Sequence, residues 1–228
     1  MRIAVEKSGP FTHAPTSVTR TMTLVLAALL PATLYNIWLF GWPALFMFLV
    51  TVLSCVGFEA LFLKLSNRPV ADTLADGSAV LTGWLLAMSM PPWCPWWVCV
   101  IGSLFAIGIA KHAFGGLGQN VFNPAMVGRI AVLVSFPVPM TAFVAPAPIG
   151  SAHAPGFLDG LSIIFGGSKA FDSLSAASSL GYVKTELSRG IPVTQSITHA
   201  PGLTDQTLGI HPGSFGETAA VQILLGGQ

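Results

Sequence analysis

Charged residues are scarce in this sequence. They make up 8% of its 228 residues, whereas a soluble domain carries about 25%. The sequence has ten Lys and Arg and nine Asp and Glu, and it contains no run of basic residues. Because nucleic acid binds to clusters of basic residues, we predict no nucleic-acid partner. Apolar residues replace the charges: 53% of the chain is hydrophobic and the mean hydropathy is +0.72. This composition predicts a membrane protein whose partners are the lipid bilayer and other subunits.

Cysteine is rare as well. Cys55, Cys94 and Cys99 are isolated in the sequence, and the interval from Cys94 to Cys99 fits neither a zinc site nor an iron–sulfur motif. We therefore expect no disulfide framework, no metal site, and ordinary apolar packing of the three thiols. The N-terminal region lacks an apolar stretch before a small-residue cleavage site, so we predict no secretory signal peptide. Insertion then relies on the first membrane-spanning helix.

Long apolar windows are abundant. Five of them approach the roughly twenty residues that a helix needs to span a bilayer. They are Thr21–Phe40, Trp42–Leu63, Ala71–Met90, Trp93–Ala110 and Ala125–Val144. Turn and helix-end signals separate the windows, and short connections make neighbouring helices antiparallel. The fold class that we predict is an all-α polytopic membrane protein with five transmembrane helices, the start of a sixth and a long external loop.

The basic residues predict an orientation. Seven of the ten lie in the N-terminal tail, in the second loop, or in the fourth loop and its flank. These seven are Arg2, Lys7, Arg20, Lys64, Arg68, Lys111 and Arg129, and the other three are Lys169, Lys184 and Arg189. Under the positive-inside rule the N-terminus is cytoplasmic, and five crossings take the chain to the external side.

Tryptophans gather on the two loops predicted to be external. They are Trp38, Trp42, Trp93, Trp96 and Trp97. An aromatic belt at the membrane interface explains this placement. Aromatic packing in the core is the alternative.

We divide the chain into four segments: a cytoplasmic tail at 1–20, a membrane domain at 21–144, an external loop at 145–212 and the start of a further helix at 213–228. The loop is rich in Gly, Ser, Pro and Thr, with short apolar pieces such as Leu161–Phe165, so we predict a long ordered loop and not a second domain. The last segment begins an apolar helix with Glu217 in its first turn. Because about twelve residues cannot span a bilayer, we expect the natural polypeptide to continue or another chain to complete the bundle.

A few acidic residues interrupt the apolar windows. Asp72 and Asp76 are four residues apart and so on one helix face. A role in ion binding or subunit contact is one interpretation, and snorkelling or a helix N-cap is the other. Glu59 is a similar candidate, for which a helix-end salt bridge with Lys64 is the alternative.

A second polar cluster spans Ala110–Arg129 and contains four glycines, Asn120, Asn123 and Pro124. Glycine permits turns at positive φ, asparagine can bond its own backbone, and proline suits the first helical position. Free amide groups at such a helix start can hold an anion or a carbonyl group. Neither a dinucleotide fingerprint nor a P-loop can be read there. A cytoplasmic turn is therefore the favoured interpretation.

The third polar cluster is "DSLSAASSL", Asp172 to Leu180. Serines in such a stretch cap a helix, form a flexible linker or accept a covalent group. No His or Lys base is evident beside them, and no G-x-S-x-G signature is present. We therefore predict no catalytic residue, and the residues alone favour the first two uses.

Six segments together resemble one family. They cover nearly the whole chain and are "THAPTSVTRTM", "FGWPAL", "DGSAVLTGWLLAMSMPP", "AKHAFGGLGQNVFNPAMVGRIAVLVSFP", "DSLSAASSL" and "GSFGETAAVQILLGG". In order and content they are similar to the NqrB/RnfD family. This family contains one membrane component of the Rnf electron-transport complex, RnfD, and one of the sodium-translocating NADH:quinone oxidoreductase, NqrB.

The resemblance implies covalently bound FMN. Members of the family carry FMN joined through its phosphate to a hydroxyl, usually of threonine, at the end of the motif D-x-[VLI]-S-[GA]-A-[TS]. Here the motif begins at Asp172 and its acceptor position is Ser178. Serine replaces the usual threonine, and Ser179 follows where proline is common. Ser175 and Ser179 therefore stay open as alternative acceptors.

The resemblance also implies a function. The protein would be a membrane component of an ion-translocating oxidoreductase complex in the bacterial inner membrane, with its FMN loop on the periplasmic side. Electrons would pass between partner subunits in a ferredoxin- or NADH-linked chain, coupled to movement of sodium ions or protons, and this protein would position the flavin and tune its potential. The alternative is a secondary transporter or channel-type protein with no redox group, which broken helices and buried acids would favour.

Overall fold

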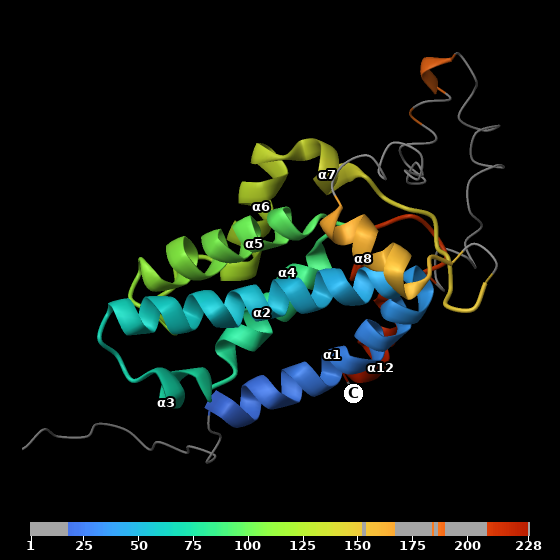
Figure 1. Ribbon diagram of the computed structural model, residues 1–228. Coiled ribbons are helices and arrows are strands. Elements are labelled where there is room, and N and C mark those ends of the chain that lie inside the picture. The colour runs from blue at the N-terminus through green and yellow to red at the C-terminus, as the bar shows by residue number, and fades with distance from the viewer. Residues whose placement is uncertain (1–17, 152–153, 167–183, 185–186, 190–208, 228) are drawn as a thin grey trace, which may run out of the picture.

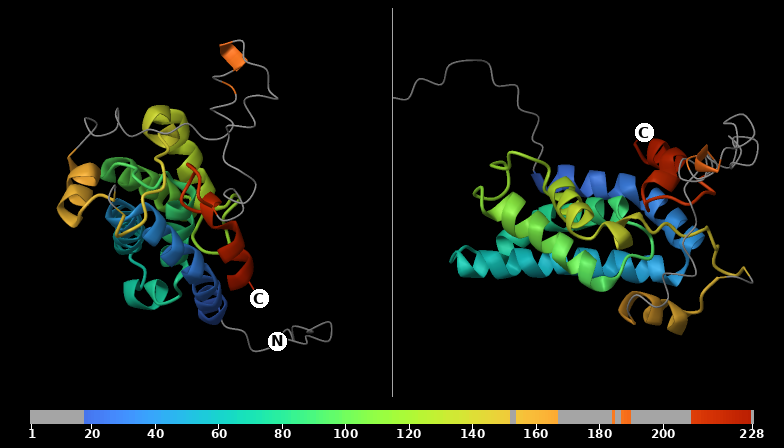
Figure 2. Two further views of the ribbon diagram at one scale, coloured as in Figure 1. Left: turned by 90° about the vertical axis from the view of Figure 1, so that its right-hand side faces the viewer. Right: turned by 90° about the horizontal axis from the view of Figure 1, so that it is seen from above.

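The computed structural model describes residues 18–151, 154–166, 184, 187–189 and 209–227. This part of the chain is built from helices, and the longer ones lie side by side in a bundle (Figures 1 and 2). The turn after α1 and the helix α8 lie at one end of the bundle, and α3 lies at the other (Figure 1).

Two helices are long and apolar enough to cross a membrane. They are α1 (Val18–Phe40) and α2 (Trp42–Leu65), with 23 and 24 residues. A single residue, Gly41, joins them, and Pro43 lies in the first turn of α2. Both helices coincide closely with the first two predicted windows.

The third window is not one helix. A short helix α3 (Val70–Leu74) ends in a turn, and α4 (Ser78–Ser89) begins after Gly77. Gly77 has a φ of 77°, in the left-handed region that favours glycine. The Asp76 carboxylate accepts a hydrogen bond from the Ser78 amide at 2.7 Å. The prediction of a single helix over Ala71–Met90 is therefore wrong, because this turn precedes a new helix that begins inside the apolar window.

The fourth window is one continuous helical segment, but its second half is widened. α5 (Trp96–Leu104) runs directly into the π-helix η1 (Phe105–His112). π-helical turns are rare and occur often at functional sites. The last two residues of η1 are Lys111 and His112.

The fifth window is interrupted as well. α6 (Pro124–Ser135) ends at Phe136, and α7 (Pro137–Thr141) follows. Pro137 disfavours a helical conformation at the residue before it, and Phe136 accordingly has φ −134° and ψ 64°. A single helix over Ala125–Val144 is therefore wrong.

Part of the predicted external loop is helical. α8 (Phe157–Phe165) lies across the start of α2, where Phe157 makes edge-to-face contacts with Trp42 and Phe46 at centroid distances of 5.3 and 5.2 Å. The apolar piece Leu161–Phe165 is thus the second half of a packed helix.

The last described segment returns to α1. η3 (Glu217–Ala219) and α12 (Ala220–Gly226) lie beside α1 (Figure 1). The Glu217 carboxylate accepts from the Ser214 amide at 3.3 Å, as predicted for a first-turn acid. Asn36 of α1 joins the two segments, because it donates to the Phe215 carbonyl and accepts from the Thr218 hydroxyl.

Apolar side chains and small residues fill the space between the helices. Cys55, Cys94 and Cys99 are buried there as free thiols, as predicted. The tryptophans divide between the two roles that the sequence left open. Trp38 and Trp96 are exposed, whereas Trp93 is buried and donates to the Phe40 carbonyl at 3.0 Å.

Gly128 lets α6 approach α5 and η1 closely. A Cβ at Gly128 would lie 2.6 Å from the Gly102 carbonyl oxygen and 2.9 Å from the Ala106 Cβ. We expect Gly128→Ala to destabilise the protein by about 1–3 kcal/mol, because the added methyl group forces backbone apart. A lower thermal midpoint of the purified protein in detergent would show this. Gly57→Ala is the matched control, since a Cβ at Gly57 meets no atom within 4 Å. Equal midpoints for the two variants would contradict the expectation.

Candidate functional site

An acidic side chain is buried within the bundle. Glu59 lies in α2, six residues before its last residue Leu65 and so about 9 Å inside the helix end. Its side chain is 1% exposed. An ionised carboxylate is costly to bury unless it is paired and hydrogen-bonded.

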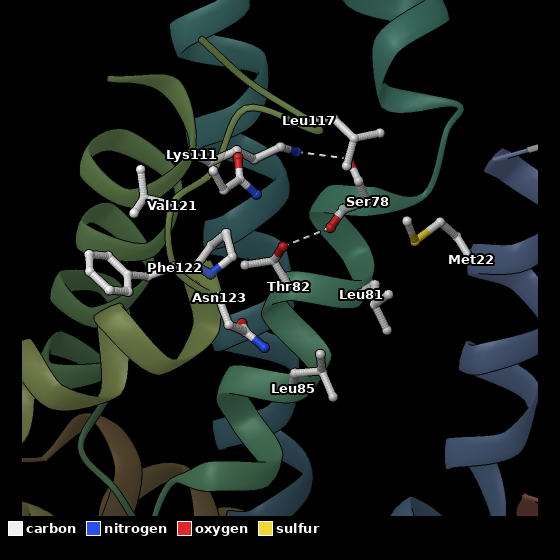
Figure 3. Close-up of a pocket in the computed structure, with 12 residues that line it drawn as sticks. Met22, Ser78, Leu81, Thr82, Leu85, Lys111, Leu117, Val121, Phe122 and Asn123 are labelled. Atoms are coloured by element: carbon white, nitrogen blue, oxygen red, sulfur yellow. Dashed lines mark hydrogen bonds between the residues drawn. The ribbon is translucent and has the colours of Figure 1, made fainter. Parts of the chain in front are cut away.

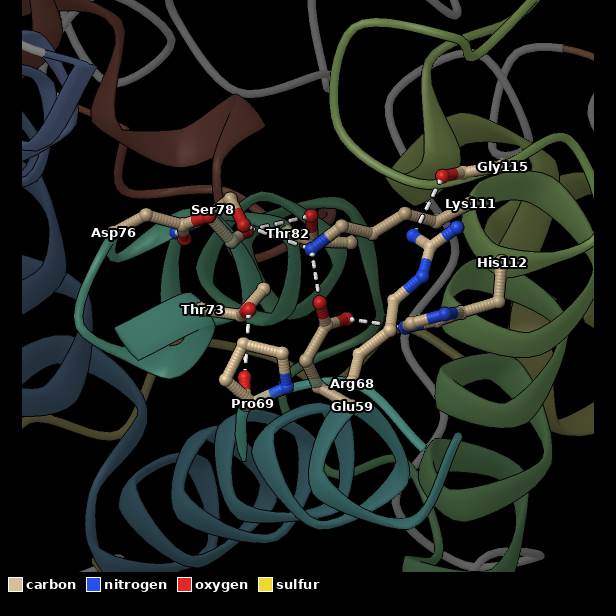
Figure 4. A network of polar contacts seen from close by, with 10 residues as sticks. All are labelled: Glu59, Arg68, Pro69, Thr73, Asp76, Ser78, Thr82, Lys111, His112 and Gly115. Atoms are coloured by element: carbon tan, nitrogen blue, oxygen red, sulfur yellow. Dashed lines mark hydrogen bonds and ion pairs between the residues drawn. The ribbon is translucent and has the colours of Figure 1, made fainter. Parts of the chain in front are cut away.

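Lys111 supplies the pairing charge. Its Nζ lies 2.8 Å from the Glu59 Oε1 and donates to the Ser78 Oγ at 2.8 Å (Figure 4). The Lys111 side chain is 2% exposed. The ammonium group is therefore held between a carboxylate of α2 and a hydroxyl at the first residue of α4.

His112 faces the second oxygen of the same carboxylate. Its Nε2 lies 3.1 Å from the Glu59 Oε2, although the ring N–H is not aligned for a hydrogen bond. The imidazole ring stacks on Phe62 at a centroid distance of 5.5 Å and is 9% exposed. We call Glu59, Ser78, Lys111 and His112 the charged cluster. One carboxylate thus has an ammonium group at one oxygen and an imidazole at the other.

Local structure places these residues. The hydrogen bond from the Ser78 amide to the Asp76 carboxylate fixes the turn before α4 and so the position of Ser78. Lys111 and His112 are consecutive in a π-helix and both reach the same carboxylate. The helix-end alternative for Glu59 is wrong, because its partner is Lys111 and the Lys64 side chain is exposed. The Asp76 carboxylate bonds the Ser78 amide beside Gly77, the N-cap residue of α4, so of the interpretations left open a local bond at a helix start holds for Asp76. Asp72 is exposed on α3, so the two carboxylates do not share a helix face.

The loop after η1 closes this end of the bundle. Gly115, Gly116 and Gly118 have φ values of 109°, 103° and 85°, as the glycine-rich pattern predicted. Arg68 donates to the Gly115 carbonyl at 3.0 Å and ties the loop to the end of α2. The Asn123 carboxamide oxygen accepts from the Ala125 amide at 3.0 Å and caps α6, with Pro124 as the first helical residue. Both roles were predicted.

A cavity of about 410 Å³ lies beside the charged cluster (Figure 3). It is bounded by α1, α4, the end of η1 and the loop before α6. Its apolar walls include Leu81, Leu85 and Phe122, and its polar lining consists of Ser78, Thr82, Lys111, Asn120 and Asn123. The Asn120 Oδ1 is buried without a hydrogen-bond partner. A cavity of this size, lined by both apolar and polar side chains, suits a ligand that has an apolar body and a few polar groups.

Sequence reasoning did not find the cavity or the pairing of Glu59 with Lys111. Ser175, Ser178 and Ser179 lie outside the described residues. Among the described residues, no group of three or more His, Cys, Asp and Glu side chains is arranged to hold a metal ion.

Comparison with known proteins gives a consistent result. Residues 5–228 match the model of the NQR2, RnfD, RnfE family. A protein of Rhodobacter capsulatus is 51% identical over 220 residues, which cover 96% of this chain and 61% of the relative. A protein of Halorhodospira halophila is 46% identical over 220 residues, which cover 96% of this chain and 62% of the relative. A third, from Stutzerimonas stutzeri, is 50% identical over 211 residues, 92% of this chain and 59% of the relative.

All three relatives are named as the D component of an ion-translocating oxidoreductase complex. The chain spans about three fifths of the length of these relatives.

Proposed function

The chain belongs to the NQR2, RnfD, RnfE family, and from this we propose that it acts as a membrane component of a redox-driven, ion-translocating electron-transport complex. The names of its relatives support this function. The structural observation that supports it most is the buried pair of Glu59 and Lys111. Ionisable groups inside a membrane-spanning bundle are costly, and they commonly mark pathways for ions or protons.

Partner subunits and a translocated cation follow from this proposal. The charged cluster lies at the end of the bundle that also holds α3 and the Gly115 loop (Figure 4). The positive-inside rule makes that end cytoplasmic. Glu59 and His112 would then be the first titratable groups that a cation from the cytoplasm meets inside the bundle. Sodium ions and protons are both candidates for the translocated species.

FMN on an external loop is the redox group that we propose. α8 ends at Phe165, at the end of the bundle opposite to the charged cluster, and the acceptor motif begins a few residues later at Asp172. A serine hydroxyl has the chemistry needed for a phosphoester with the flavin phosphate, and Ser178 occupies the acceptor position. The bound flavin would supply electron transfer. This chain would hold the flavin on the periplasmic side of the bacterial inner membrane and position it between partner subunits.

A covalent flavin is the direct test of this function. We expect the protein, isolated from cells that make the complete complex, to fluoresce in a denaturing gel, because a phosphoester survives unfolding. Its mass should exceed the polypeptide mass by FMN less one water. A protein without covalent flavin would exclude the proposed redox group. It would favour the second candidate, a transporter or channel-type protein, which the interrupted third and fifth helices also suit.

The proposed orientation has its own test. A reporter fused after Lys64 or His112 should be active only in the cytoplasm, and a reporter inserted near Pro192 only in the periplasm. The expectation follows from the seven basic residues on one side and three on the other. Paired reporters, one active in each compartment, supply the control for expression. A cytoplasmic signal from the Pro192 insertion would reverse the assigned topology.

A further inference from the structure

We propose that the Lys111 ammonium group moves between two positions. Through this movement a charge inside the cavity controls whether Glu59 is paired with Lys111 or with another cation. A negative charge in the cavity draws the ammonium group off the carboxylate, and a cation from the cytoplasmic side then takes its place at Glu59. The inference depends on the proposed function only for the source of the negative charge.

The geometry places Lys111 between two sites. Its Nζ contacts the Glu59 Oε1 and the Ser78 Oγ, each at 2.8 Å, and both Lys111 and Ser78 line the cavity (Figures 3 and 4). Thr82 lies one helical turn beyond Ser78, and its hydroxyl donates to the Ser78 carbonyl at 2.8 Å. Lysine has a flexible stem and three donors. Rotation of the terminal bonds therefore moves the ammonium group from the carboxylate toward the cavity without moving a helix.

Because of the charges at the site, movement of Lys111 away from Glu59 leaves the carboxylate without its cation. When Glu59 is ionised and Lys111 protonated, their pair is neutral. His112, at 3.1 Å, also faces the carboxylate, and the buried Cys55 thiol interacts with both charges of the pair. Asp76 bonds the Ser78 amide, and Arg68 bonds the Gly115 carbonyl. One added negative charge on the cavity wall lies close enough to the buried Lys111 to attract its ammonium group. The site restores neutrality by taking up a proton on Glu59 or His112, or a metal cation at Glu59.

The cavity indicates what carries the negative charge. Its apolar walls at Leu81 and Leu85 suit a ring, and Lys111 and the unpaired Asn120 Oδ1 offer a donor and an acceptor. Under the proposed function, a redox-active ring that becomes anionic on reduction would supply this charge. Each electron that reached the ring would then favour uptake of one cation at Glu59. This is the kind of linkage that an electron-driven ion pump needs.

A carboxylate placed in the cavity tests the movement of Lys111 without any ligand. In Thr82→Asp the new charge lies on the cavity wall, and Thr82→Asn is the neutral control of the same size. The readout is labelling of the Glu59 peptide by dicyclohexylcarbodiimide, which reacts with protonated carboxyl groups in apolar surroundings. Labelling is done in a buffer without sodium or other metal cations, so that a proton is the cation available to Glu59. We expect a several-fold rise in labelling for Thr82→Asp and none for Thr82→Asn. The exposed Glu217 serves as an internal reference within the same digest.

In Thr82→Asp, direct repulsion between the new carboxylate and the Glu59 carboxylate would also favour protonation of Glu59. The Lys111→Met variant separates this repulsion from the movement of Lys111. In Lys111→Met the labelling should already be high, and adding Thr82→Asp should raise it little further. A rise of equal size with and without Lys111 would overturn the proposal, as would unchanged labelling in Thr82→Asp.

The unmutated complex supplies a measurement that does not depend on the folding of a variant. Reduction in a sodium-free buffer, with a reductant that is not a sodium salt, should raise the labelling of Glu59 if the charge arises on a reducible ring. Equal labelling of the oxidised and reduced complex would overturn that assignment. Because carbodiimide labelling requires no covalent FMN, failure of this proposal and failure of the proposed redox function are distinguishable.

Discussion

Replacement of Lys111 by methionine should lower the free energy of unfolding by about 3–5 kcal/mol, the usual cost of removing one partner of a buried ion pair. The variant leaves the Glu59 carboxylate in a site where its side chain is 1% exposed. The Ser78 hydroxyl also loses its donor. Thermal or denaturant unfolding of the protein in one detergent would measure the loss.

Removal of both charges should recover most of that stability. The double variant Glu59→Gln, Lys111→Met contains no buried charge at the pair, and apolar or neutral replacements of buried ion pairs are often neutral in stability. Lys64→Met is the matched control: Lys64 is an exposed lysine near the end of the same helix, so its loss should change stability by no more than about 0.5 kcal/mol. If the double variant were as unstable as the single variant, the pair would not be the reason for the loss.

The double variant should be stable but should not transport ions. A protein with neither charge folds, but it has no carboxylate to exchange a cation. We expect it to assemble with its partners and to lose ion transport coupled to electron transfer. This difference distinguishes a pair kept for function from one kept for folding.

The apolar windows predicted the helical elements well where the chain forms one uninterrupted helix. Both α1 and α2 were found from length and hydropathy alone. The interruptions at Gly77 and Phe136 were missed, because hydropathy averages over about twenty residues, whereas the break depends on one positive φ or on one proline. Gly77 beside Asp76, and Pro137 inside an apolar window, were the available signals.

The charged cluster could not be predicted from the sequence, for a different reason. Glu59 and Lys111 are 52 positions apart, and sequence reasoning finds helix-surface partners only three or four residues away. That limit led to Lys64 as the alternative partner. A usable signal did exist: Glu59 interrupts the second apolar window and Lys111 directly follows the fourth, both near the same predicted side of the membrane, and buried charges require partners. The cap formed by Asn123 and the bond of Asp76 to the Ser78 amide were predictable because they are local.

Ser178→Ala should abolish the covalent flavin completely. The expectation rests on the match of "DSLSAAS" to the acceptor motif of the family and on the proposed periplasmic position of the loop. The variant loses one hydroxyl in a segment outside the predicted membrane windows, so insertion should be unchanged. Fluorescence in a denaturing gel and the mass of the peptide containing position 178 measure the loss, and immunoblotting of the membrane fraction measures insertion.

Two further variants assign the acceptor. Ser178→Thr restores the residue that the family usually has at this position, so it should retain the flavin and fluoresce at least as strongly as the unmutated protein. Ser175→Ala removes a neighbouring hydroxyl and should leave the signal intact, since Ser175 matches an internal position of the motif and not its end. Flavin that persisted in Ser178→Ala would move the linkage to Ser175 or Ser179, and the labelled peptide would show which. The register of the motif, and with it the phosphoester at Ser178, would then be wrong, while the redox function of the protein would stand.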